Sequence, residues 1–183
     1  MDAVNPTADV SVRPAVPEDA ARVARIQLAA WRTLHAGTPA EAAMAAVEED
    51  AVATTWRASI ERPPDPRHQV LVACAGPDVV GFAAAVPSRP ADPADPAEPG
   101  AVQIVALEVD PARRREGHAS RLLAAVVDLA RERGAHHVQA WSLETDEARM
   151  AFLTGAGLSP AGLRRTLDVP GAAMDEVLLT AAL

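Results

Sequence analysis

The feature that most constrains the fold is a succession of strand, turn, helix and strand in the second half of the chain. Residues 102–109 are an apolar run of strand length, residues 119–133 carry apolar side chains at helical spacing, and residues 137–142 form a second short strand. A helix that connects two strands allows them to lie side by side in the same direction. The second half of the chain therefore predicts a parallel strand pair.

The remaining segments predict antiparallel strands around this pair. Two apolar runs, 69–75 and 79–86, flank Gly76-Pro77-Asp78, a pattern typical of a β-hairpin. The expected order is strand 11–14, helix 17–36, helix 40–60, the hairpin, strand 102–109, helix 119–133, strand 137–142, helix 146–154, and a last hairpin over 163–180 bent at Pro170-Gly171. This order predicts an α/β fold with a mixed, mostly antiparallel sheet.

Length and charge limit the class of protein. The chain has 183 residues, a net charge of -8 and one cysteine, Cys74. One domain is expected over residues 11–183, after a tail at 1–10 that has no apolar run and is not typical of a signal peptide. The acidic balance argues against nucleic acid as a partner, and a single cysteine permits no intrachain disulfide. We expect a cytoplasmic protein with no membrane partner and no metal.

Residues 87–100 are rich in proline. Prolines recur every third residue from Pro87 to Pro99, which is the period of a polyproline II helix, and three acids lie among them. We expect a semi-rigid connection between two strands. A partner-binding arm or a lid over an active site is the alternative.

Residues 107–120 (LEVDPARRREGHAS) carry the chemistry that the sequence shows best. The first N–H groups of a helix have no acceptor within the helix, and its dipole favours an anion there. Gly117 and Ala119 let the backbone approach a ligand closely, while Arg114 and Arg115 add positive charge. Neither a Walker motif nor a dinucleotide fingerprint is present. The segment predicts a cradle of amides for a pyrophosphate.

Arg114-x-x-Gly117-x-Ala119, after a Leu-x-Val-Asp-Pro strand, resembles the coenzyme A pyrophosphate loop of the GNAT superfamily of acetyl-CoA-dependent N-acyltransferases. The order of elements, Ala30-Trp31-Arg32, and the segments 141–146 and 152–158 are similar to that family as well. The resemblance covers residues 11–180. It implies a GNAT-like fold with helices on both faces of the sheet and a parallel strand pair that splays apart.

The resemblance also implies acetyl-CoA as cosubstrate and assigns residues to it. Backbone groups of the strand would pair with the pantetheine arm, and the loop after it would surround the pyrophosphate. The implied cofactor-binding residues are Leu107, Glu108, Val109, Arg114, Arg115, Glu116, Gly117, His118, Ala119, Ser120, Asp146, Arg149 and Phe152. We expect the His118 side chain itself to be solvated.

Acylation of an amine requires a base, because an ammonium group has no free electron pair for attack. Glu108 and Glu144 are the candidate bases, His35 is a weaker one, and the backbone N–H of Val109 is the candidate donor to the oxyanion. Both acids could instead be solvent-facing side chains. Many relatives carry a tyrosine that protonates the leaving thiolate; here that position is Leu153, and the chain contains no tyrosine. Gln103 stands where many relatives carry an acid.

Three functions remain open from the sequence. The first is an N-acetyltransferase acting on a small-molecule or protein amine. A homodimer is expected only because two-fold dimers are the commonest oligomers. The second is a degenerate relative that binds acyl-CoA as a sensor or scaffold with little turnover, which the missing tyrosine and Gln103 favour. The third is an unrelated domain whose loop holds another phosphate.

Overall fold

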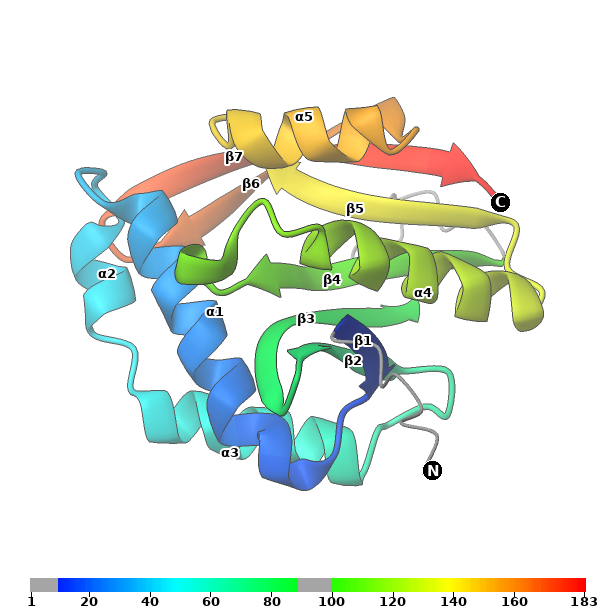
Figure 1. Ribbon diagram of the computed structural model, residues 1–183. Helices are drawn as coiled ribbons and strands as arrows, with labels where there is room; N and C mark the ends of the chain where they lie inside the picture. Colours follow the sequence, from blue (N-terminus) through cyan, green and yellow to red (C-terminus); the bar gives the residue numbers. More distant parts are fainter. Residues whose placement is uncertain (1–9, 89–99) are drawn as a thin grey trace.

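A seven-stranded sheet in the order β1-β2-β3-β4-β5-β7-β6 forms the centre of the protein in the computed structural model, which describes residues 10–88 and 100–183 (Figure 1). The expected tail, apart from Val10, and most of the proline-rich segment lie outside the described residues. The strands are β1 (Val10–Pro14), β2 (Gln69–Ala75), β3 (Asp78–Pro87), β4 (Ala101–Val109), β5 (His137–Leu143), β6 (Ser159–Val169) and β7 (Ala172–Ala182).

Neighbouring strands are antiparallel except for β4 and β5, which are parallel. The connection between these two strands contains α4 (His118–Glu132), as the order of elements predicts. Their pairing extends only from Ala101–His137 to Ile104–Ala140, although both strands continue beyond it. The mixed sheet with one parallel pair is therefore confirmed, and so is a gap in strand pairing after residue 104.

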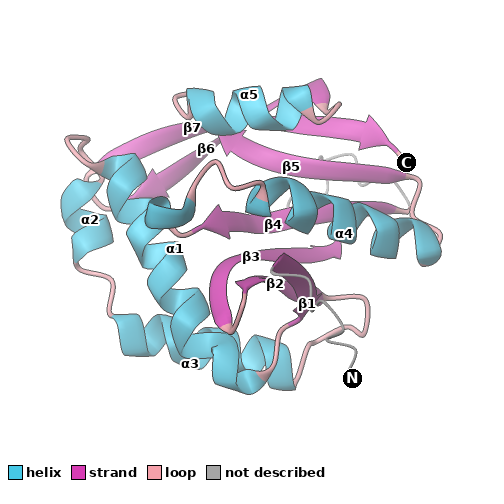
Figure 2. Cartoon of the chain, viewed as in Figure 1, coloured by secondary structure: helices cyan, strands magenta, loops and turns pink. Residues whose placement is uncertain are grey.

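Helices cover both faces of the sheet, as predicted (Figure 2). Successive residues of β2 point to opposite faces of the sheet: Leu71 belongs to one apolar cluster and Val72 to the other. The first cluster includes Leu122 of α4 and Leu153 of α5 (Glu147–Gly155). The second includes residues of α1 (Ala20–His35), and Trp56 of α3 (Glu49–Glu61) packs against it.

The expected helix over 40–60 is wrong in one respect, because two helices occupy this stretch. They are α2 (Glu41–Ala45) and α3, separated by residues 46–48. Glu48 has an extended backbone (φ -79°, ψ 127°), so it interrupts the helical hydrogen bonds. Glu49 and Asp50 then lie in the first turn of α3, where acidic side chains favour a new helix start. The sequence did not indicate this break, because apolar residues continue at helical spacing across residues 46–48.

The first expected helix also begins differently. Residues Pro17–Asp19 form a short 3-10 turn, and the α-helix starts at Ala20. Asp19 accepts hydrogen bonds from the Val16 N–H (2.8 Å) and from Arg13 (2.7 and 2.9 Å). The Arg13 guanidinium holds the pKa of Asp19 below its usual value, and burial acts in the opposite direction. This ion pair joins β1 to the start of α1.

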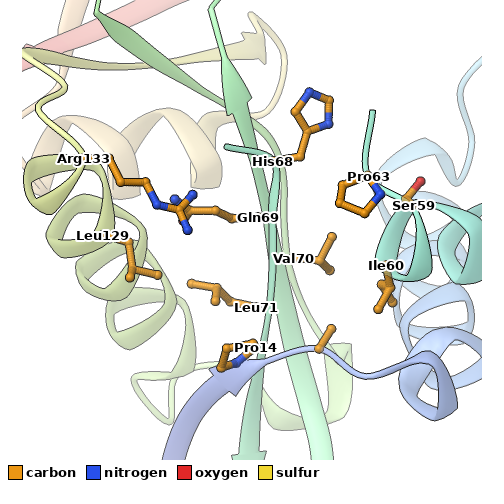
Figure 3. A pocket seen from close by; sticks show the side chains of 11 residues that line it. Pro14, Ser59, Ile60, Pro63, His68, Gln69, Val70, Leu71, Leu129 and Arg133 are labelled. Atoms are coloured by element: carbon orange, nitrogen blue, oxygen red, sulfur yellow. The ribbon is translucent and has the colours of Figure 1, made fainter. Parts of the chain in front are cut away.

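A hollow of about 230 Å³ opens where β2 begins (Figure 3). Its lining includes Ile60 near the end of α3, Leu129 in the last turns of α4, and Arg133 just after that helix. Gly117 lies at the other end of α4, about 20 Å away along the helix axis. The hollow is therefore separate from the predicted pyrophosphate loop.

None of the described helices is long and apolar enough to cross a membrane.

Candidate active site

The turn after β4 is held by Asp110. Its side chain accepts hydrogen bonds from the Ala112 N–H (3.0 Å) and from Arg22 of α1 (2.7 Å), and Arg22 also donates to the Val79 carbonyl (2.8 Å). The Ala112 N–H, followed by Arg22, lowers the pKa of Asp110 against the opposing effect of burial. The turn is thus anchored to α1 by an ion pair between residues far apart in the sequence.

The loop that follows presents backbone amides at the start of α4. Arg115 and Gly117 both have positive φ angles, 66° and 80°, and Gly117 is the N-cap residue of the helix. Within the described part of the chain, none of the N–H groups of residues 114–120 makes a hydrogen bond of good geometry to another protein group. Such amides at a helix start are suited to an anion, and binding of a pyrophosphate there stays a prediction.

Side chains of the loop are engaged with one another rather than with these amides. Arg113 binds the Glu116 carboxylate (3.0 Å), and Arg121 donates to the Glu116 carbonyl (2.9 Å). Arg113, and then His118, lower the pKa of Glu116. Glu116 is thus an internal contact of the loop, and its carboxylate would not favour a phosphate.

The expectation that the His118 side chain is solvated is wrong. His118 is the first residue of α4 and is 2% exposed. Its Nε2 lies 3.2 Å from the Glu116 carboxylate, while its buried Nδ1 has no hydrogen-bond partner among the residues that the structure describes. The polar type of the residue suggested a loop position, but the helix begins one residue earlier than expected and turns this side chain inward. A role in cofactor binding through the His118 backbone remains a prediction.

The strand edge that faces β5 is open beyond the last β4–β5 pair. The Asp110 N–H donates to the Val80 carbonyl of β3 (2.9 Å), and successive N–H groups of a strand point to alternate sides. The Val109 N–H therefore points away from β3, toward the open edge. The Leu107 carbonyl points the same way and accepts a hydrogen bond from Arg149 of α5 (3.2 Å).

Glu108 lies at this edge, opposite Phe82 in the β3–β4 register. Phe82 belongs to the cluster beneath α1, so Glu108 faces that side of the sheet, whereas Leu107 belongs to the cluster beneath α4. Burial raises the pKa of Glu108, the Arg149 charge lowers it, and Asp146 raises it further. A partly buried carboxylate with a raised pKa is suited to accept a proton near neutral pH.

Helix α5 supplies the other side of the gap. Asp146 is its N-cap residue and accepts a hydrogen bond from the Arg149 N–H (3.0 Å). Phe152, predicted as a cofactor contact, is partly buried and packs against the core beneath α4. The structure therefore brings Asp146 and Arg149 near Glu108, and it explains Asp146 as a helix cap.

The other two candidate bases are placed differently. Glu144 follows β5 and forms an ion pair with Arg164 of β6. His35 is the last residue of α1 and is 7% exposed, and its backbone carbonyl accepts a hydrogen bond from the Thr38 N–H (3.0 Å). In the described part of the chain, no hydrogen bond or ion pair joins either residue to Glu108 or Arg149. Glu108 is the stronger candidate because it lies on β4 beyond the last β4–β5 pair.

Sequence reasoning did not predict two contacts that shape this site. The first is the Arg22–Asp110 pair, and the second is the pair between Arg149 and Glu108 (3.2 Å). Each joins residues more than 40 positions apart. Nothing in the local sequence indicates such pairs.

Gln103 lies away from this edge. Its side-chain oxygen accepts a weak hydrogen bond from Gln139 (3.4 Å), which also donates to Ser88 (2.6 Å). Gln103 is therefore part of a polar contact between β4 and β5, in the region where these strands still pair.

Leu153, in the position where relatives carry a tyrosine, is fully buried in the core beneath α4. We expect Leu153→Tyr to lower the free energy of unfolding by about 1–3 kcal/mol, because the larger ring overfills a closed core and its hydroxyl loses water. Chemical denaturation measures the change. Leu153→Met, which conserves volume, is the matched control and should cost less. Equal stability of the tyrosine variant and the wild type would contradict the closed core.

Comparison with known families identifies the class of protein. The Acetyltransferase (GNAT) family model matches residues 28–157, which is more than half of the chain, and the chain belongs to that family. The match begins in α1 and extends through the loop at 114–120 to Gly157. No curated protein sequence matches the chain.

Solved structures share the fold at low sequence identity. YncA from Salmonella typhimurium, solved with acetyl-CoA, is 20% identical with a TM-score of 0.67 and covers 95% of this chain and 94% of its own. PaiA N-acetyltransferase from Thermoplasma acidophilum, solved with coenzyme A, is 12% identical with a TM-score of 0.69, covering 95% and 99%. Ribosomal-protein-alanine N-acetyltransferase from Brucella melitensis is 22% identical with a TM-score of 0.68, covering 94% and 99%. These matches show a common fold.

Proposed function

We propose that this protein transfers an acetyl group from acetyl-CoA to an amine by direct attack of the amine on the thioester. The observation that carries the proposal is the unused set of amides at residues 114–120 beside the unpaired edge of β4. A pyrophosphate needs several N–H donors, and an extended amide chain needs an unpaired strand edge. The fold offers both within one continuous segment.

Particular groups would hold each part of the cosubstrate. The amides around Gly117 and the side chain of Arg114 would bind the pyrophosphate, since they combine free donors with positive charge. Backbone groups of Leu107 and Val109, which point to the open edge, would pair with the pantetheine arm. The Leu107 carbonyl accepts a hydrogen bond from Arg149, and its second lone pair would remain for the pantetheine amide. The absence of a Cβ at Gly117 leaves room for close approach.

Glu108 would accept a proton from the ammonium form of the acceptor. The neutral nitrogen then forms a bond to the thioester carbon, and the carbon–sulfur bond breaks, so the electron pair leaves with the thiolate. The Val109 N–H would stabilise the negative charge that develops on the carbonyl oxygen. The thiolate takes up one proton, and the second nitrogen proton goes to solvent, giving an acetylated amine and free coenzyme A.

The thiolate would be protonated without a tyrosine. Leu153 is closed within the core and offers no proton, so water would deliver it. Coenzyme A thiolate is a tolerable leaving group, and loss of one general acid reduces a rate without abolishing it. A slower enzyme is the expected consequence.

The acceptor is proposed only by chemical class. It would be a small-molecule or protein amine, and the net charge of -8 weakly favours a cationic one through electrostatic steering. The acceptor nitrogen would approach from the α1 side of the sheet, since Glu108 faces that side.

A second candidate is an acyl-CoA-binding relative with little turnover. The burial of Leu153, in the position where many relatives carry the tyrosine that protonates the thiolate, favours it. Both candidates require acetyl-CoA binding, and they differ only in the rate of acetyl transfer.

We expect acetyl-CoA at 100 times its Kd to raise the melting temperature by roughly 5–10 °C, because binding to the native state adds about 2.7 kcal/mol. Thermal unfolding with a titration of acetyl-CoA measures this shift. Thiol release across a panel of amines then separates the two candidates. No shift in melting temperature at millimolar acetyl-CoA would contradict both candidate functions. A shift without thiol release would favour the second candidate.

A further inference from the structure

Arg149 spans the gap between α5 and the open edge of β4. Its Nη1 lies 3.2 Å from the Leu107 carbonyl oxygen and 3.2 Å from the Glu108 carboxylate. At its other end, the residue is fixed by the hydrogen bond from its own backbone N–H to Asp146. The helix turn that carries Arg149 is thus capped, and two contacts at the gap hold its guanidinium.

This arrangement places the charged guanidinium of Arg149 where water has limited access. The side chains of Arg149 and Glu108 are 19% and 21% exposed, and among residues 10–88 and 100–183 the buried Nε of Arg149 has no hydrogen-bond partner. A buried guanidinium remains protonated, and an unpaired buried donor costs free energy. Packing alone would be achieved at lower cost by an apolar side chain. The positive charge of Arg149 is therefore better explained by its contact with the Glu108 carboxylate than by packing.

Three charged groups act on the Glu108 carboxylate. Arg149 and Arg114 favour its ionised form, whereas Asp146 opposes it, and burial opposes it most of all. Arg149 is the cation in hydrogen-bond contact, since Nη1 reaches the Oε1 atom. Its removal would leave burial and Asp146 opposed only by Arg114.

We propose that Arg149 is a positioning residue for acetyl transfer: its guanidinium, anchored on the Leu107 carbonyl, holds the Glu108 carboxylate in its ionised form at the open edge of β4. This inference rests on the proposed function, in which Glu108 is the base. Arg149 acts through Glu108, so its effect depends on pH. A residue that only contacts the cosubstrate would change the affinity for acetyl-CoA at all pH values instead.

The first test is the pH dependence of kcat/KM for the acceptor in the wild type, Arg149→Gln and Arg149→Lys. In Arg149→Gln, we expect the acidic limb of the profile to move to higher pH, because the carboxylate loses its nearest cation. At pH 6 the rate should fall roughly tenfold and approach the wild-type rate at high pH. Arg149→Lys, which keeps the charge, should restore most of the profile. Arg131→Gln, which removes an exposed arginine near the far end of α4, is the control and should leave the profile unchanged.

The second test needs no turnover. Carbon-13 NMR of glutamate carboxyl groups follows the titration of Glu108, whose signal is assigned by its loss in Glu108→Gln. We expect the midpoint to rise in Arg149→Gln and to return toward the wild type in Arg149→Lys. An unchanged midpoint, or a change confined to the KM for acetyl-CoA, would overturn the positioning role. A wild type without turnover would instead refute the proposed function, while this titration still decides the role of Arg149.

Discussion

Gly117→Glu should abolish the stabilisation of the protein by acetyl-CoA. At φ 80°, a side chain strains the backbone, and its Cβ would lie 3.0 Å from Nη1 of Arg121. The Arg121 guanidinium can move aside, so the main effect comes from the new carboxylate, which would compete for the free amides and repel a pyrophosphate. Thermal unfolding with and without millimolar acetyl-CoA measures the loss.

Gly134→Glu is the matched control for this variant. Gly134 follows the other end of α4, has a similar φ of 76°, and has open space around its Cβ position. The backbone strain is therefore comparable, whereas the change lies far from the loop. We expect Gly134→Glu to keep the full response to acetyl-CoA. An undiminished response in Gly117→Glu would show that the cradle is assigned to the wrong segment.

Glu108→Gln should lower kcat by roughly 10²- to 10⁴-fold, the range for loss of a general base. An amide cannot accept the ammonium proton, although it fills the same space and can accept a hydrogen bond from Arg149. The acidic limb of the pH profile should disappear, while acetyl-CoA binding persists. Steady-state kinetics and a thermal titration with acetyl-CoA measure these effects on the same preparation.

The control for this variant is the other candidate acid. Glu144 is paired with Arg164 on β6, and within the described residues no hydrogen bond or ion pair links it to Glu108 or Arg149. Glu144→Gln should therefore retain most of the activity. A larger loss in Glu144→Gln than in Glu108→Gln would reverse the assignment of the base.

Local patterns predicted the parts of this fold that depend on periodicity and turns. The parallel pair followed from the helix between two apolar strands, and the last hairpin turns at Pro170-Gly171 as its sequence indicates. The loop before α4 was predictable because positive φ angles, free amides and a helix start all lie within a few residues. Each of these features depends on residues that are neighbours in the sequence.

Tertiary contacts account for what the sequence did not reveal. The break between α2 and α3 is an exception, because its cause is local: Glu48 is extended, and Glu49 and Asp50 start the second helix. Burial of His118 depends on how α4 lies on the sheet. The Arg149–Glu108 pair joins α5 to β4, and no local pattern specifies which charges meet across a gap.

The parting of β4 from β5 has a consequence for the mechanics of the protein. Four residue pairs join the first four strands to the last three, yet one apolar core beneath α4 and α5 includes side chains from both parts. Resistance to separation at this seam therefore depends more on side-chain packing than on main-chain bonding. Because a closely packed interior transmits strain, a substitution in that shared core would act on both halves of the sheet and on the seam between them.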